Sequence, residues 1–213
     1  MVRIKICGIT NHNDASIAVK LGVHGLGFIF APSPRMIAPE TAREIIHIIP
    51  PFVQTVGVFV NEEPAIIKEL MDFCGLDLIQ LHGDESPEIC EELMPRAIKA
   101  FRLKDESGLE PVRHYAGKVR AVLFDTYSKG KRGGTGETFD WDLAVKGKEL
   151  GAPIILAGGL TPSNIEEAIS KVRPFAVDVN SGIEEHPGIK SPVLIKELME
   201  KIRRMDMGGL LDD

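Results

Sequence analysis

Three apolar runs in the sequence end in a side chain that can take up or release a proton. Cys7 closes VRIKIC, His82 closes LDLIQLH, and Asp125 directly follows VRAVLF. A thiol and a carboxyl group can serve as base and acid in one reaction when their surroundings push their pKa values apart. Cys7 and Asp125 are therefore the first candidates for chemistry.

The first of these runs has one charged face. Side chains alternate along a strand, so Arg3, Lys5 and Cys7 share a face opposite an apolar one that must meet helices. A lysine pointing into a closed sheet needs a partner, and Asp178 or Asp125 could provide it. A neighbouring ammonium lowers the pKa of a thiol, which makes Cys7 a candidate base or nucleophile. A small buried hydrophobe explains this position equally well.

Asp125 ends its run on the face that Ala121 and Leu123 share. To act as an acid at neutral pH it must hold a proton, a state that burial and a nearby substrate anion favour. An aspartate that caps the following loop is the simpler alternative. His82 is equally compatible with a hydrogen-bonded core residue and with the wall of a site.

Two glycine-containing turns near the C-terminus could bind phosphate. LAGGLTPSNI places Gly158 and Gly159 before a helix start expected at Thr161, and VDVNSGIEE places Ser181 and Gly182 after another strand. Glycine lets the backbone approach a ligand, and free N–H groups at a helix start attract anions. One such turn is commonly only a tight connection, but two in successive loops favour a phosphate site.

Arg35 ends the proline-framed stretch FIFAPSPR. A guanidinium held in a rigid loop can bind a carboxylate at two points, although a solvated surface arginine has the same sequence pattern. The later stretch SKGKRGGTGETFDW (128–141) is glycine-rich and basic, which suits a loop that covers a bound anion. It lacks the G-x-G-x-x-G spacing of a dinucleotide site.

Short apolar runs alternate with amphipathic stretches along the whole chain. Strands are predicted at 2–7, 25–30, 55–60, 76–82, 97–101, 119–124, 153–158 and 175–180. Eight strand–helix units in this length favour an α/β protein with a single (β/α)8 TIM barrel over a doubly wound sheet. We expect a catalytic barrel domain over 1–204 and a frayed tail over 205–213. In such a barrel the candidate residues, which follow the strands, would gather at one mouth.

Composition narrows the classes of partner and compartment. A formal net charge of −6 does not suit a broad nucleic-acid surface but permits a local phosphate pocket. Three widely spaced cysteines indicate a reducing compartment, with Cys74 and Cys90 structural in helices. The first ten residues lack a signal-peptide pattern, and no apolar run reaches the roughly 18 residues that span a membrane. We expect a cytoplasmic protein with a small phosphorylated ligand, and the histidine spacing predicts no metal site.

Beyond these separate features, the motifs taken together, over about residues 2–204, resemble one family. They are KICGIT, GFIFAPSPR, VGVFVN, IQLHGDE, FDT, GGTGETFDW, LAGGLTPSNI and VRPFAVDVNSGIE, in this order. This set is similar to the phosphoribosylanthranilate isomerases of tryptophan biosynthesis. The resemblance implies a single barrel that uses no cofactor and converts N-(5-phosphoribosyl)anthranilate to the 1-deoxyribulose 5-phosphate isomer by an Amadori rearrangement.

The resemblance also implies roles for particular residues. Cys7 would be the general base, Asp125 the general acid, and Arg35 the ligand of the anthranilate carboxylate. The residues implied or expected to bind the rest of the substrate are His82, Gly158, Gly159, Asp178, Ser181 and Gly182. Asn180 stands where the family pattern often has serine, which puts one phosphate contact in doubt. We expect a monomer or a homodimer.

Three alternatives remain from the sequence. A sugar-phosphate epimerase would share the phosphate-binding turns but usually needs metal ligands. An indole-glycerol-phosphate synthase would have different catalytic motifs. A non-catalytic barrel that binds a phosphorylated ligand and regulates a partner could dispense with Cys7 and Asp125, so the presence of both favours the enzyme.

Overall fold

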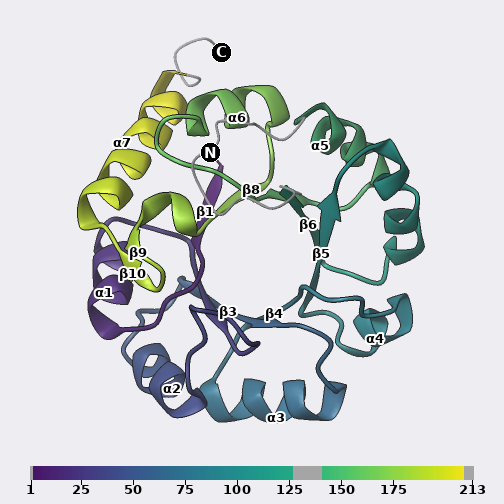
Figure 1. Cartoon of the computed structure of the whole chain (residues 1–213), viewed down its shortest axis with the longest axis horizontal. Coiled ribbons are helices and arrows are strands. Elements are labelled where there is room, and N and C mark those ends of the chain that lie inside the picture. The colour runs from purple at the N-terminus through teal and green to yellow at the C-terminus, as the bar shows by residue number, and fades with distance from the viewer. Residues whose placement is uncertain (1, 127–140, 209–213) are drawn as a thin grey trace.

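The computed structural model describes residues 2–126 and 141–208, and its centre is a closed barrel of eight parallel strands in sequence order (Figure 1). The strands are β1 (Arg3–Ile6), β2 (Gly25–Ile29), β3 (Gln54–Phe59), β4 (Leu78–Leu81), β5 (Ala97–Leu103), β6 (Ala121–Thr126), β7 (Ile154–Leu156) and β8 (Ala176–Val179). Strand β8 pairs with β1 and closes the barrel. The predicted TIM-barrel fold is therefore confirmed.

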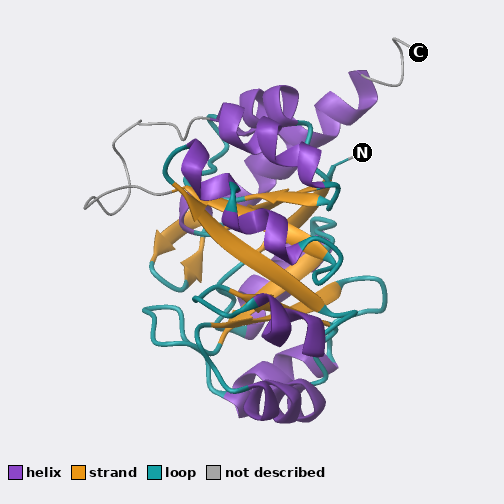
Figure 2. Cartoon of the chain, turned by 90° about the vertical axis from the view of Figure 1, so that its right-hand side faces the viewer, coloured by secondary structure: helices purple, strands orange, loops and turns teal. Residues whose placement is uncertain are grey.

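Helices form a ring outside these strands (Figure 1). Seen from the side, the strands run obliquely inside this ring of helices (Figure 2). The α-helices are α1 (His12–Lys20), α2 (Pro39–His47), α3 (Pro64–Cys74), α4 (Pro87–Glu92), α5 (Trp141–Gly147), α6 (Ile165–Val172) and α7 (Pro192–Gly208). Two 3-10 helices, η1 (Glu106–Leu109) and η2 (Pro111–Tyr115), occupy the place of a helix after β5, and η3 (Lys148–Leu150) follows α5. The connection between β5 and β6 therefore contains 3-10 helices and no α-helix.

Local sequence explains where several helices begin and end. The Asn11 side chain accepts a hydrogen bond from the backbone N–H of Asp14 at 2.9 Å and caps α1, as an N-cap residue should. Helix α3 begins at Pro64 and ends before Gly75, whose φ of 77° is readily adopted only by glycine. These residues set where α1 begins and where α3 ends.

Helix α6 begins later than the sequence indicates. The expected start at Thr161 is a turn instead, and the helix begins at Ile165. Asn164 holds this turn, because its Oδ1 accepts from the Thr161 N–H at 2.8 Å and its Nδ2 donates to the Gly159 carbonyl at 3.0 Å. The side-chain hydrogen bonds satisfy groups that a first helical turn would otherwise leave unpaired.

The core has two layers. One lies between the strands and the helices, and the other fills the inside of the barrel near the N-terminal ends of the strands. The inner cluster consists of Ile98, Ala100, Ala121, Leu123, Ile155, Ala157 and Ala176, with Leu78 against it. Side chains alternate along each strand, so every second residue points into the barrel. The inner cluster fills the N-terminal part of this interior, and the inward-facing residues at the C-terminal ends of the strands are free to be polar.

A small hairpin that the sequence did not predict follows β8. The 3-10 turn η4 (Ser181–Ile183) leads into β9 (Glu184–His186), which pairs antiparallel with β10 (Ile189–Lys190). The expected domain boundary at residue 204 falls within α7, and 209–213 lie outside the described residues, as does nearly all of the basic loop at 128–141. Within the described part of the chain, every helix is too short or too polar to cross a membrane.

Candidate active site

A cavity of about 280 Å³ opens at the C-terminal ends of the strands. Its lining comes from strands or loops far apart in the sequence: Cys7, Ile29, Val58, Gln80, His82, Asp125, Ala157, Gly158, Gly159, Leu160, Asp178, Asn180, Ser181 and Gly182. Of the residues expected to take part in catalysis or substrate binding, all but Arg35 line it. The mouth of the barrel therefore brings together a thiol, two carboxyl groups, a histidine and both glycine turns.

Lys5 is the buried cation of this site. Its Nζ donates to Asp178 Oδ2 and to Gln80 Oε1, both at 2.9 Å, and its side chain is 8% exposed. Burial alone would lower the pKa of Lys5, but Asp178 and the nearby Cys7 outweigh it and raise the pKa above its usual value. Of the two partners that the sequence suggests for Lys5, the structure selects Asp178, which faces it across the β1–β8 ladder.

Cys7 lies beside this ammonium, buried but at the cavity wall. A Cβ on Gly27 of β2 would approach the Cys7 Sγ to 2.8 Å and the Lys5 Nζ to 3.0 Å, so glycine leaves the space that both side chains fill. Burial raises the pKa of the Cys7 thiol, and the attraction of Lys5 only partly offsets this. The expected lowering by the ammonium is therefore present, but burial exceeds it.

A chain of polar contacts connects Lys5 with Asp125. Since the Gln80 Oε1 accepts from Lys5, its amide Nε2 faces the His82 Nδ1 at 3.0 Å and donates to it. The ring proton then belongs on the His82 Nε2, which lies 3.3 Å from the Asp125 Oδ2, without hydrogen-bond geometry. His82, for which the sequence left two roles open, is a wall of the cavity.

The two glycine turns meet each other at the cavity. Gly158 and Gly159 have φ values of 82° and 63°, and their N–H groups have no hydrogen-bond acceptor among the described residues. A Cβ on Gly182 would lie 1.9 Å from the Leu160 carbonyl oxygen, so only glycine permits the two turns to pack this closely. The arrangement presents backbone donors that can bind an anion.

Arg35 lies at the rim, over Gly8. A Cβ on Gly8 would meet the Arg35 Cδ at 2.9 Å and the Asn180 Oδ1 at 2.8 Å, so the arginine stem packs next to a cavity-lining residue. Its guanidinium binds a carboxylate at two points, as its sequence context predicts, but that carboxylate belongs to Glu184 of the chain itself. The hydrogen bonds that Arg35 donates to Glu184 raise the pKa of Arg35.

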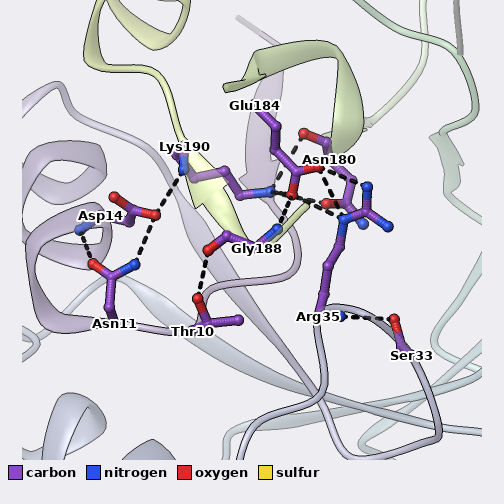
Figure 3. A network of polar contacts seen from close by, with 9 residues as sticks. All are labelled: Thr10, Asn11, Asp14, Ser33, Arg35, Asn180, Glu184, Gly188 and Lys190. Carbon is purple, nitrogen blue, oxygen red and sulfur yellow. Dashed lines mark hydrogen bonds and ion pairs between the residues drawn. The ribbon is translucent and has the colours of Figure 1, made fainter. Parts of the chain in front are cut away.

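Three residues of this region have roles that the sequence did not reveal. Gln80 links Lys5 to His82, and its strand-end position was the only signal for it. Glu184 and Lys190 belong to the hairpin and contact the rim of the mouth (Figure 3). No local pattern marks them, because besides contacting each other they bind Arg35 and Asp14, which lie far away in the sequence.

Known proteins match the chain along nearly its whole length. A family model described as N-(5'-phosphoribosyl)anthranilate (PRA) isomerase matches residues 4–201. The N-(5'-phosphoribosyl)anthranilate isomerase of Geobacter sulfurreducens is 52% identical over 204 residues, 95% of this chain and 99% of that protein. The crystal structure of phosphoribosyl anthranilate isomerase from Thermotoga maritima superimposes with a TM-score of 0.90 at 43% identity, covering 96% of this chain and all of that one.

A further crystal structure of a phosphoribosyl anthranilate isomerase is a complex with reduced 1-(o-carboxyphenylamino)-1-deoxyribulose 5-phosphate. It matches with a TM-score of 0.86 at 41% identity, over 96% of this chain and 100% of that one. The sequence motifs, the barrel and these matches agree. This chain therefore belongs to the N-(5'-phosphoribosyl)anthranilate isomerase family.

Proposed function

We propose that this chain catalyses the Amadori rearrangement of N-(5-phosphoribosyl)anthranilate to 1-(2-carboxyphenylamino)-1-deoxyribulose 5-phosphate in tryptophan biosynthesis. One observation carries the proposal beyond family membership. Cys7 and Asp125, a candidate base and a candidate acid, line the same cavity as the two glycine turns. An isomerisation that moves protons within a phosphorylated sugar needs these three elements together.

The first step is ring opening. Asp125, partly exposed at the mouth, donates a proton to the furanose ring oxygen, and the C1–O bond breaks to leave an open-chain Schiff base. The His82 Nε2 lies 3.3 Å from the Asp125 Oδ2, so the imidazole is the polar neighbour of this carboxyl group. A phosphate dianion bound nearby favours the protonated acid before the step.

The second step removes a proton from carbon 2 of the sugar. The Cys7 thiolate takes this proton, and the resulting enolamine tautomerises to the ketone as carbon 1 gains a proton and the hydroxyl group on carbon 2 loses one. The Lys5 ammonium stabilises the thiolate form, against the burial that disfavours it. Lys5 is itself held by Asp178 and Gln80, so the charge beside the sulfur is fixed before substrate binds.

The rest of the substrate would be held at its two ends and in the middle. The N–H groups of the Gly158–Gly159 and Ser181–Gly182 turns suit the phosphate. The buried Asp178 Oδ1 has no hydrogen-bond partner among the described residues, and a sugar hydroxyl that donates to it would satisfy it. Arg35 at the rim would bind the anthranilate carboxylate.

A fluorescence assay that follows consumption of N-(5-phosphoribosyl)anthranilate by the purified protein tests the proposal. We expect turnover by the wild type, and turnover within background for the double variant Cys7→Ser/Asp125→Asn, which should still bind the reduced product analogue. Substantial residual turnover by the double variant would overturn the roles of both residues. A protein that binds the analogue but never turns over substrate would instead support the non-catalytic alternative.

A further inference from the structure

The guanidinium of Arg35 is bound along one edge only. Its Nε donates to both carboxylate oxygens of Glu184, at 2.8 and 3.0 Å, and its Nη2 donates to the Glu184 Oε2 at 2.6 Å (Figure 3). An arginine has five N–H donors in a planar fork. The Nη1 group and one proton of Nη2 thus form a second edge that has no acceptor among the described residues.

Glu184 is fixed independently of Arg35. Its Oε1 accepts from the Lys190 Nζ at 2.8 Å and from the Gly188 backbone N–H at 3.2 Å, and its side chain is 5% exposed. Burial by itself would raise the pKa of Glu184, but the hydrogen bonds from Arg35 and Lys190 outweigh it and keep the pKa below its usual value. The carboxylate is therefore a stationary negative charge at the rim.

The anchor of Glu184 extends into the barrel. The Lys190 side chain is fully buried, and its Nζ also donates to the Asn180 Oδ1 at 2.8 Å, while its backbone N–H donates to the Asp14 Oδ2 at 2.8 Å. The hairpin is thereby tied to α1 and to the end of β8 (Figure 3). The Glu184 carboxylate is therefore held by the hairpin and, through Lys190, by α1 and the end of β8. A charge fixed in this way can orient the side chain of Arg35, which comes from the loop after β2.

We propose that Glu184 is a positioning residue for Arg35, and that it thereby sets the enzyme's selectivity for a carboxylated aromatic ring. Glu184 binds the side edge of the guanidinium and leaves the end edge for the carboxylate of the substrate. This role rests on the proposed function and deepens it. Competition between Glu184 and the substrate for Arg35 is the opposite reading, but the two carboxylates would use different N–H groups.

Binding of two ligands to the purified full chain tests this role. The first ligand is reduced 1-(o-carboxyphenylamino)-1-deoxyribulose 5-phosphate, and the second is the same compound with an unsubstituted phenyl ring. We expect Glu184→Gln to weaken binding of the first about tenfold, and of the second less than about twofold. The KM for N-(5-phosphoribosyl)anthranilate should rise by a similar factor with kcat little changed. Glu110→Gln, which removes the surface partner of Arg113, is the matched control and should change neither.

The double variant Arg35→Ala/Glu184→Gln separates positioning from an independent effect. If Glu184 acts through Arg35, the double variant binds the carboxylated ligand no more weakly than Arg35→Ala alone. Additive losses, equal losses for the two ligands, or tighter binding of the carboxylated ligand by Glu184→Gln would each overturn the role. Should Glu184→Gln fail to fold, Glu184→Asp keeps the charge and should show a smaller loss for the carboxylated ligand alone.

Failure of this role is distinguishable from failure of the proposed function. Turnover by the wild type together with unchanged ligand selectivity in Glu184→Gln would remove the role of Glu184 only. Equal affinity of the wild type for the two ligands would remove the role of Arg35 as well. A wild type without turnover would remove the proposed function itself.

Discussion

The two ends of the barrel are built from the same strands and yet differ in character. Near the N-terminal ends the inner faces carry apolar side chains, around a cavity of about 210 Å³. Two residues further along, the same faces carry groups that ionise or form hydrogen bonds. The pairs in this order are Leu78 and Gln80, Leu123 and Asp125, and Ala176 and Asp178.

Because of this difference, one end of each strand contributes mainly to the stability of the fold and the other end mainly to the candidate active site. The apolar end removes side chains from water and so contributes to the free energy of folding. The polar end buries Lys5 and Asp178, whose removal from water is costly and is offset by their mutual contact and by the hydrogen bond from Lys5 to Gln80. Substitutions at the two ends should accordingly change different quantities.

The largest effect is expected at the mouth, from Asp125→Asn. Loss of the general acid should lower kcat by about 10²- to 10⁴-fold, because an amide cannot donate the proton to the ring oxygen. The free energy of unfolding should change little, since the Asp125 side chain is 27% exposed. Steady-state kinetics and urea unfolding check both expectations, and a kcat within threefold of the wild type would remove the assigned role.

Lys5→Met should affect both quantities, because Lys5 lies where the two regions meet. It leaves Asp178 as an unpaired buried charge, which costs about 3–5 kcal/mol of folding free energy. It also removes the ammonium that stabilises the Cys7 thiolate, so activity should fall. Asp178→Asn added to Lys5→Met should restore most of the stability and none of the activity. A double variant as unstable as Lys5→Met would show that the pair is not the cause.

Leu123→Ala tests the apolar end. Leu123 is fully buried in the inner cluster, so its truncation should lower the free energy of unfolding by about 2–5 kcal/mol, measured by urea denaturation. The kcat of the folded fraction should stay close to that of the wild type. A large loss of kcat at full folding would contradict the separation of the two ends.

The smallest effect concerns the ionisation of Cys7. Since burial raises the pKa of its thiol, the rate of alkylation by iodoacetamide should still increase above pH 9, where an ordinary thiol with a pKa near 8.5 levels off. Mass spectrometry resolves Cys7 from Cys74 and Cys90, which are fully buried and serve as internal controls. A plateau below pH 8 would show that Lys5 dominates over burial.

The sequence predicted the barrel because its signals are local. Each strand lies in a short, mostly apolar run, and each run is followed by a helical period or a turn, so eight units could be counted directly. The hairpin of β9 and β10 gave no such signal. It has strands of three and two residues. Lys190 and Glu184 hold it by a contact with each other and by contacts with Asp14 and Arg35 elsewhere in the chain.

The candidate site was predictable where strand alternation or a glycine-containing turn decides it. Strand alternation predicted that Lys5 and Cys7 point into the barrel. A buried lysine needs an acidic partner, so a carboxylate next to Lys5 was also predicted. The contact of Arg35 with Glu184 spans 149 residues, and no periodicity encodes such a pair. The sequence also could not predict in which direction the pKa of Cys7 shifts, because the direction depends on how completely packing excludes water from the sulfur.

The central claim is that the Cys7 thiolate removes the proton from carbon 2 of the sugar, and Cys7→Ser tests it most directly. Its single-turnover rate with N-(5-phosphoribosyl)anthranilate is measured beside its affinity for the reduced product analogue. The account predicts a rate lower by about 10²- to 10⁴-fold with affinity close to that of the wild type. A serine variant that converts substrate at nearly the wild-type rate would contradict it.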